Sequence, residues 1–428
     1  MIRSGNLANS FPSDSPDTTA ALSPAGRALR RLAAAFTYRD FRVLWFGAFT
    51  SSTGTWMQSV AQAWLVLTLT KSAFYLGLDA FLGQLPIMLL TLIGGVVADR
   101  RDRRRLLLMS QWIQMTTAFT LAGLVYWDVV RIWHILTLSF VTGCAQAFGG
   151  PAYQSLIPSL VKKDDLPNAI ALNSIQFNLA RVIGPLLAGL ALATRGTVFC
   201  FTLNGLSFLA VIVALVSLHV RHVAPQVTQR MAHELRIGLS YVRHQGPLFV
   251  LTFLAFVTTF LGASLLTLLP IVAKSVFNKG VGEYSELMAF SGAGAVVGAL
   301  VVAWLGRFRR MGTTALLVQI IFGLLIIGFA ASRIELLSEL LLFAGGAAMM
   351  IVFSSTTSLV QLVVPNEMRG RVVSIYMLAF RGGMTLGALA SGTVAALTSA
   401  PVALALSGTL LALIAVCVLF SSQSLREL

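Results

Sequence analysis

The chain has 428 residues, of which 57% are hydrophobic and 11% are charged, and its mean hydropathy is +0.82. A soluble domain carries about 25% charged residues, so this composition excludes an ordinary soluble protein and predicts that lipid surrounds most of the chain. The net charge of +15 comes from short basic clusters between long apolar runs. Because a nucleic-acid-binding protein gathers its basic residues on one water-facing surface, we expect no nucleic-acid partner.

The chain begins with a polar stretch and continues with twelve apolar runs. Residues 1–40 contain no long apolar core, and we expect them to form a disordered cytoplasmic tail. A helix needs about 20 apolar residues to cross a bilayer. The runs that meet this need form two groups of six: 41–69, 74–98, 106–126, 132–155, 168–193 and 198–218, then 247–273, 287–305, 313–331, 336–363, 372–397 and 402–420. The sequence predicts an all-α membrane protein of two six-helix bundles, over 41–218 and 247–420.

The stretch 219–246 joins the two predicted bundles and includes the segment MAHELRIGLSYVRH. Its apolar residues recur at helical spacing, as Met231, Leu235, Leu239 and Val242 do. This pattern predicts an amphipathic linker helix on the cytoplasmic surface, with a partner-binding helix as the alternative. Residues 421–428 are expected to form a cytoplasmic C-terminal tail.

The basic residues fall mainly on one side of the predicted spans. Of the 31 Lys and Arg residues, 23 lie on the side that holds both termini, and six lie on the opposite side. The remaining two, Arg181 and Arg381, lie within spans. Lys and Arg are retained in the cytoplasm, so we expect a multi-pass protein of the bacterial inner (cytoplasmic) membrane with both termini inside.

The two halves resemble each other when the sequence is shifted by about 203 residues. The shift superposes similar residues at four positions: Gly95 on Gly298, Arg104 on Arg307, Asp164 on Glu367 and Gly189 on Gly392. Such a repeat is typical of duplicated transporter bundles, whose substrate sites lie near the bilayer midplane between the repeats.

A charged loop follows the second predicted span. It reads Gly95-Val-Val-Ala-Asp99-Arg100-Arg-Asp-Arg103-Arg104-Arg105 and resembles the signature loop of the major facilitator superfamily. An aspartate beside arginines at a helix end can form a charge-assisted latch against a neighbouring helix terminus. The resemblance implies a latch of Gly95, Asp99, Arg100, Arg103 and Arg104 against residues 371–374, which favours the outward-open state. The alternative is that these arginines only set topology.

A second motif lies in the fifth predicted span. The segment from Ala180 to Gly189, with Gly184 and Pro185, resembles the motif that this superfamily associates with antiporters, although Ala180 and Ala188 replace glycines. The segments YRDFRVLWFGAFTSS and PNEMRGRVVSIYMLAFRGG are similar to the branch that contains the enterobactin exporter and macrolide efflux proteins. This branch implies proton-driven export of a siderophore, a drug or another amphipathic small molecule.

The fourth span departs from the pattern of the drug/proton antiporters, many of which have an arginine there. Here that span has Gly143 and Gln146 and no arginine, so proton coupling must use other residues or differ in detail. Asp79 is the candidate, because burial favours the neutral form of a carboxyl group, which a proton-exchanging group needs. The alternative is that Asp79 only fixes helix packing.

Two arginines and three glutamines are candidates for the substrate cavity. A charge at membrane depth costs about 2.5 to 3.5 kcal/mol, so Arg181 and Arg381 require a function or a partner. They are expected either to hold an anionic or carbonyl-rich substrate or to bond to helix ends. The amides of Gln58, Gln62 and Gln146 are expected to line the cavity or to bond across helices.

The sequence offers little for catalysis. Its three cysteines and five histidines show no disulfide or metal-site spacing, and no span holds paired carboxylates or a nucleophile motif. We therefore expect a monomeric secondary transporter without cofactor, metal or enzymatic activity, whose partners are a small-molecule substrate, protons and lipid. An importer or facilitator of a small metabolite, and a non-transporting sensory or enzymatic membrane protein, are the alternatives.

Overall fold

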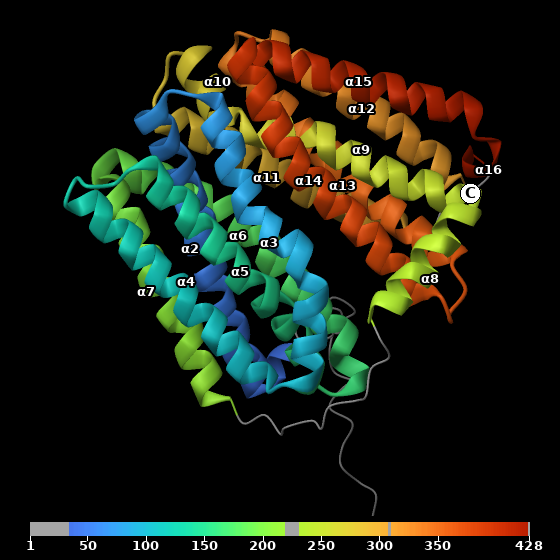
Figure 1. Cartoon of the computed structure of the whole chain (residues 1–428), viewed down its shortest axis with the longest axis horizontal. Coiled ribbons are helices and arrows are strands. Elements are labelled where there is room, and N and C mark those ends of the chain that lie inside the picture. The colour runs from blue at the N-terminus through green and yellow to red at the C-terminus, as the bar shows by residue number, and fades with distance from the viewer. Residues whose placement is uncertain (1–33, 219–230, 307–309, 427–428) are drawn as a thin grey trace, which may run out of the picture.

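The computed structural model describes residues 34–218, 231–306 and 310–426, and within them the chain is almost entirely helical (Figure 1). Twelve helices have 21 to 32 residues. They are α2 (Arg39–Thr70), α3 (Ala73–Arg100), α4 (Arg103–Tyr126), α5 (Ile132–Leu156), α6 (Leu166–Thr194), α7 (Gly196–Ser217), α9 (Gly246–Thr267), α11 (Val281–Leu305), α12 (Met311–Ala331), α13 (Glu335–Val363), α14 (Arg369–Leu397) and α15 (Ala400–Ser421).

Shorter helices lie between and beside the long ones. They are η1 (Ala34–Thr37), η2 (Ile157–Ser159), η3 (Lys163–Asp165), α8 (Met231–His244), α10 (Leu269–Ser275) and α16 (Gln423–Arg426). Each predicted span therefore coincides with a long helix, except that the run 247–273 covers both α9 and the short α10. The prediction of an all-α membrane protein is confirmed. Most of the predicted N-terminal tail and the first part of the predicted linker lie outside the described residues.

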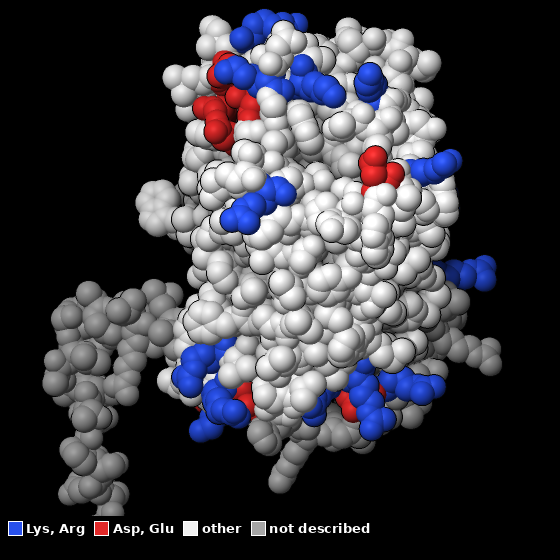
Figure 2. All heavy atoms as spheres, turned by 90° about the vertical axis from the view of Figure 1, so that its left-hand side faces the viewer, with Lys and Arg blue, Asp and Glu red and all other residues white. Residues whose placement is uncertain are grey.

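Ten of the helical segments are long and apolar enough to cross a membrane. The other two predicted spans form α2 and α4, which have 32 and 24 residues but contain more polar side chains. Figure 2 shows the charged side chains of one face concentrated toward two opposite ends, with a band between them that is almost free of charged side chains. Such a band is what a surrounding bilayer requires of the protein surface.

Two pairs of helices connect the N-terminal half to the C-terminal half. α3 lies along α14, and α6 lies along α11; we call these two contacts the seams. The shift of 203 residues found in the sequence carries the bounds of α6, 166–194, onto those of α14, 369–397. It also superposes α3 on α11. The two seams are therefore equivalent contacts in a duplicated structure.

Small residues bring the backbones close together at both seams. An ideal Cβ atom on Gly77 would lie 2.5 Å from the carbonyl oxygen of Ala388, and one on Gly392 would lie 2.7 Å from that of Ala73. At the other seam, an ideal Cβ on Gly189 would lie 2.9 Å from the Cβ of Ser285. Neither seam has room for larger side chains, which is the usual arrangement where membrane helices associate by van der Waals packing.

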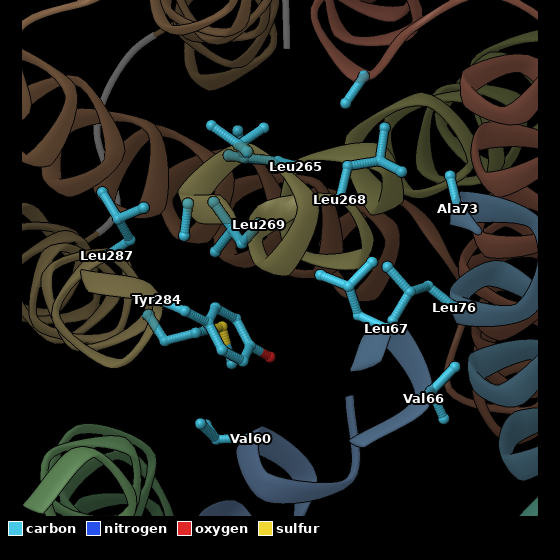
Figure 3. Close-up of a cluster of buried hydrophobic side chains, with 14 of the residues drawn as sticks. Val60, Val66, Leu67, Ala73, Leu76, Leu265, Leu268, Leu269, Tyr284 and Leu287 are labelled. Carbon is cyan, nitrogen blue, oxygen red and sulfur yellow. The ribbon is translucent and has the colours of Figure 1, made fainter. Parts of the chain in front are cut away.

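The two halves share a hydrophobic core at one end only. One cluster contains buried residues of both halves, including Val60 and Leu67 from α2 and Leu265, Leu269 and Tyr284 from the C-terminal half (Figure 3). We call this the joined end. Here Trp64 stacks on Tyr284 with ring centroids 6.4 Å apart.

At the opposite end each half has its own core. One cluster contains only residues of the N-terminal half, such as Leu107 and Leu215, and another contains only residues of the C-terminal half, such as Leu248 and Tyr376. We call this the separated end. Figure 1 shows the two bundles meeting near α10 and diverging toward α8.

The linker helix α8 packs on the C-terminal half. It lies against α14 and α9, and its Val242 is buried. Gly238 permits this approach, because an ideal Cβ there would lie 3.1 Å from the carbonyl oxygen of Arg371 in the first turn of α14. Of the apolar residues of the pattern, Val242 is buried by this packing, whereas Leu239 is exposed.

Two hydrogen bonds attach the start of the described chain to the start of α6. The backbone N–H of Ala35 donates to Asn168 at 2.8 Å, and the hydroxyl of Tyr38 donates to the Asp165 carboxylate at 2.6 Å. The hydrogen bond to this carboxylate raises the pKa of Tyr38, so its hydroxyl stays protonated at physiological pH. Residues 34–38, which fall in the predicted tail, are thus attached to the bundle.

Packing inside the C-terminal half depends on Gly294. An ideal Cβ atom on this residue of α11 would overlap the carbonyl oxygen of Phe343 in α13. We predict that Gly294→Val destabilises the protein by about 1 to 3 kcal/mol through overpacking. Thermal denaturation of the purified variant should show a lower Tm, whereas Gly150→Val should not, because an ideal Cβ on Gly150 has no heavy atom within 4 Å. Equal Tm values for the two variants would contradict this packing.

Candidate functional site

Asp79 of α3 lies in a polar cluster with residues of two other helices. Its carboxylate accepts a hydrogen bond from the hydroxyl of Ser139 in α5 at 2.5 Å and one from the amide of Gln62 in α2 at 2.8 Å. The Gln62 amide also donates to the Ser139 hydroxyl at 2.9 Å. No ion pair joins Asp79 to a cation among the described residues. We call these three residues the Asp79 cluster.

The partners of Asp79 suit both protonation states of a carboxyl group. A serine hydroxyl can donate to a carboxylate or accept from a carboxylic acid, whereas an amide N–H donates in either case. Asp79 lies two residues after Gly77, which packs at the α3–α14 seam. The cluster is therefore next to a contact between the two halves.

The three glutamines predicted to line a cavity bond across helices. Gln58 accepts a hydrogen bond from Asn204 of α7 at 2.6 Å. Gln62 belongs to the Asp79 cluster, and Gln146 of α5 donates to Gln114 of α4 at 3.2 Å. The sequence left both uses open, and the structure places all three amides in hydrogen bonds within the N-terminal half.

Arg181 lies near the middle of α6, beside the α6–α11 seam. Its guanidinium carbon lies 5.7 Å from the centroid of the Trp56 ring, which gives a cation–π contact. An ideal Cβ on Gly292 of α11 would lie 3.1 Å from the Arg181 carbonyl oxygen. Within the described part of the chain, the guanidinium has no hydrogen-bond or ion-pair partner.

Arg381 lies near the middle of α14 on the face that meets the other half. Ala388 and Gly392, which pack on α3, follow it by seven and eleven residues, so all three lie on one face of the helix. The Arg381 side chain is exposed. Across the described residues this side chain forms no hydrogen bond or ion pair. The bond to a helix end that the sequence left open for Arg381 is therefore not formed.

The antiporter-like motif provides close packing on two sides of α6. An ideal Cβ on Gly184 would overlap Trp56 of α2, and Gly189 packs on Ser285 of α11. The helix continues through Pro185. Because proline has no N–H, it leaves the carbonyl of Arg181 without its usual helical donor, and Gly292 lies beside that carbonyl.

The arginines of the predicted latch bond within the N-terminal half. Arg103 donates to the carbonyl of Ser155 at 3.0 Å, and Arg104 donates to the carbonyls of Leu215 and Val216 at 2.6 Å each. These carbonyls belong to the ends of α5 and α7. An ideal Cβ on Gly95 meets no heavy atom within 4 Å, and the side chains of Asp99 and Arg100 lie outside the described residues.

Sequence reasoning missed several polar residues that complete these contacts. Ser139, Asn204 and Gln114 are the partners of predicted residues, and Asp102 caps α4 by accepting from the backbone N–H groups of Arg104 and Arg105. Ser139, Asn204 and Gln114 could have been found in the sequence, because each is a polar residue inside an apolar span. Among the described residues, no group of three His, Cys, Asp or Glu side chains is placed to bind a metal ion.

Comparison with known proteins gives a consistent set of relatives. Residues 32–428 match the family described as transmembrane secretion effector. The chain is 26% identical to the staphyloferrin A transporter of Staphylococcus aureus, over 78% of this chain and 84% of the relative. It is 24% identical to the enterobactin exporter EntS of Shigella boydii, over 91% and 94%. It is 22% identical to macrolide efflux protein A of Streptococcus pyogenes, over 88% and 94%.

Solved structures show the same fold. A bacterial homologue of the human lysosomal transporter Spinster superposes with a TM-score of 0.70 at 13% identity, over 90% of this chain and 97% of the other. A mutant of the peptide transporter POT superposes with a TM-score of 0.73 at 13% identity, over 90% and 94%. At these identities the likeness concerns the architecture of the helices.

The hydrogen bond between Gln58 and Asn204 should be measurable as a coupling between α2 and α7. We predict a coupling energy of about 0.6 kcal/mol, and at most about 1.7, in a double-mutant cycle of Gln58→Ala and Asn204→Ala. The free energies of unfolding of the variants in SDS–lipid micelles give this coupling energy. The matched pair Gln58→Ala and Thr116→Ala should be additive, because the exposed Thr116 bonds only to its own helix. Additive effects of Gln58→Ala and Asn204→Ala would contradict the assigned bond.

Proposed function

This chain belongs to the transmembrane secretion effector family of the major facilitator superfamily, and we propose that it exports a siderophore, a drug or a similar amphipathic small molecule by alternating access. It is a multi-pass membrane transporter in family and fold. The relatives named for enterobactin export and macrolide efflux support outward movement of the cargo. Import by the same fold remains the second candidate, and no feature of the described residues favours it.

The observation that carries the proposal is the difference between the two ends of the chain. The halves share one core at the joined end and keep separate cores at the separated end. The basic loop at 101–105 lies at the separated end, because Ala98 and Leu107 on either side of it belong to the core of the N-terminal half there. If this basic side faces the cytoplasm, as the excess of Lys and Arg favours, the structure is inward-facing. An exporter takes up its cargo in that state.

We further propose that Asp79 couples transport to the proton gradient. It is held by neutral groups only, so gain or loss of its proton changes the charge of the cluster without breaking an ion pair. Its position beside the seam at Gly77 connects that charge to the contact between the halves. A charged carboxylate favours a hydrated surrounding, and its neutral form favours an apolar one.

The predicted latch is proposed to act in the opposite, outward-facing state. Asp99, Arg100, Arg103 and Arg104 would then bond near residues 371–374 of α14. In the present state, Arg103 and Arg104 bond to helix ends of their own half, and α8 lies beside Arg371. Open space at Gly95 is consistent with a latch that is released here.

A single chain is proposed to form the whole transport unit, without catalytic activity. Both helices of each seam belong to the same chain, so the path between the halves needs no second copy. The duplicated six-helix units of this superfamily are self-sufficient in the same way. The polar residues of the spans are dispersed over several helices, and we assign them to transport.

We predict that Asp79→Asn abolishes transport driven by a pH gradient but retains exchange of cargo without a gradient, because asparagine can accept from Gln62 and donate to Ser139 but cannot take up a proton. Everted vesicles with a panel of siderophores and antibiotics identify the cargo, and proteoliposomes with an imposed pH gradient measure the effect. The control is Asp128→Asn, at a positive-φ turn that asparagine tolerates. Undiminished gradient-driven transport by Asp79→Asn would exclude the coupling role.

A further inference from the structure

We propose that the cargo is an organic anion with at least two separated acidic groups, and that Arg181 of the N-terminal half and Arg381 of the C-terminal half bind it between them. This inference rests on the proposed export function and narrows its substrate class. The charge of the cargo would then decide which small molecules the chain exports.

The two arginines occupy nearly equivalent positions in the duplicated structure. The shift of 203 residues superposes α6 on α14, and it places Arg181 at position 384, three residues from Arg381. Both lie near the middle of a 29-residue helix. Two guanidinium groups therefore lie at similar depth, one in each half.

Each of these arginines also lies on a helix that forms a seam. Arg181 has Gly292 of α11 beside its backbone, and Arg381 lies on the face of α14 that packs on α3 closer to the joined end. From Ala388 to Arg381 the chain runs toward the separated end, where the halves have individual cores. Arg381 is exposed on that face, so it borders the space between the halves.

Neither guanidinium is neutralised by the described residues. An unpaired charge at this depth is energetically costly, and proteins retain one where a substrate or ion passes. The Asp79 carboxylate bonds to Gln62 and Ser139 and forms an ion pair with neither arginine. Two unpaired cations leave the midplane positively charged, which attracts an anion and opposes a cation of the same size.

The surroundings of Arg181 suit an anion with an apolar body. The Arg181 guanidinium carbon lies over the Trp56 ring, and its N–H groups form no hydrogen bond with the described residues, so they are available for a bidentate bond to a carboxylate. Phe177, one turn before Arg181, packs on Trp56 with ring centroids 6.1 Å apart and is 50% exposed. Aromatic surfaces beside a fixed cation are suited to an aromatic or otherwise apolar acid.

Two dyes with similar ring systems and opposite charges test the proposal. 5-Carboxyfluorescein is an anion with separated acidic groups, and rhodamine 123 is a cation. Binding to the purified full chain in nanodiscs is measured by fluorescence anisotropy. We expect carboxyfluorescein to bind at least about tenfold more tightly than rhodamine 123, and Arg181→Gln and Arg381→Gln each to weaken its binding by about tenfold, which are the sizes expected for one charge-assisted pair.

Three further variants separate charge recognition from folding. Arg195→Gln removes a cation from the end of α6, outside the proposed site, and should bind carboxyfluorescein like the natural chain. Arg181→Lys and Arg381→Lys keep the charge without the planar donor fork, so they should keep the preference for the anion at reduced affinity. Binding is compared only among variants whose Tm and monodispersity match those of the natural chain.

A preference for rhodamine 123, absence of carboxyfluorescein binding, or equal binding by Arg195→Gln and both site variants would overturn the anion proposal. These results would leave the export function standing, because that function is decided separately by gradient-driven transport of the siderophore and antibiotic panel. Conversely, selective carboxyfluorescein binding that depends on both arginines supports the anion site even where transport fails.

Discussion

The close contact of α3 with α14 and of α6 with α11 is the interaction on which the rest of the structure depends. Lipid provides no hydrophobic force between membrane helices, so the two halves are held by direct packing of small residues such as Gly77, Gly189 and Gly392. These residues lie toward the joined end, where one core serves both halves. The separate cores at the other end let each half move there as a unit, which is what alternating access requires.

The charged residues inside the spans follow the same helices. Asp79 lies on α3, Arg181 on α6 and Arg381 on α14, and each of these helices forms a seam. A movement at the seams therefore changes the surroundings of the proposed proton site and of both proposed cargo-binding arginines together. A ligand that contacts both halves can shift the balance between two such states by its difference in affinity for them.

The sequence predicted the long helices and the repeat, and it singled out Asp79 as a charged residue inside an apolar span. Lipid imposes strict local rules on length, apolarity and charge, which made these features visible. The sequence could not decide between a cavity and a helix-to-helix bond for Gln58 and Gln146, because their partners, Asn204 and Gln114, come from other helices. Helical spacing places Gln58 and Gln62 on one face, yet they bond to different neighbours. The bonds of Arg103 and Arg104 to helix ends were equally out of reach, since they depend on the tertiary arrangement.

A reversible disulfide across one seam tests most directly whether the joined end must open during transport. An ideal Cβ on Gly189 lies 2.9 Å from the Cβ of Ser285, which is shorter than the roughly 3.5 to 4.5 Å of a disulfide, so the two helices must separate slightly to form the bond. Gly189→Cys with Ser285→Cys, in a chain whose three native cysteines are replaced, should lose transport on oxidation and regain it on reduction, while oxidation should not change the transport rate of either single variant. Full transport by the cross-linked protein would contradict the account.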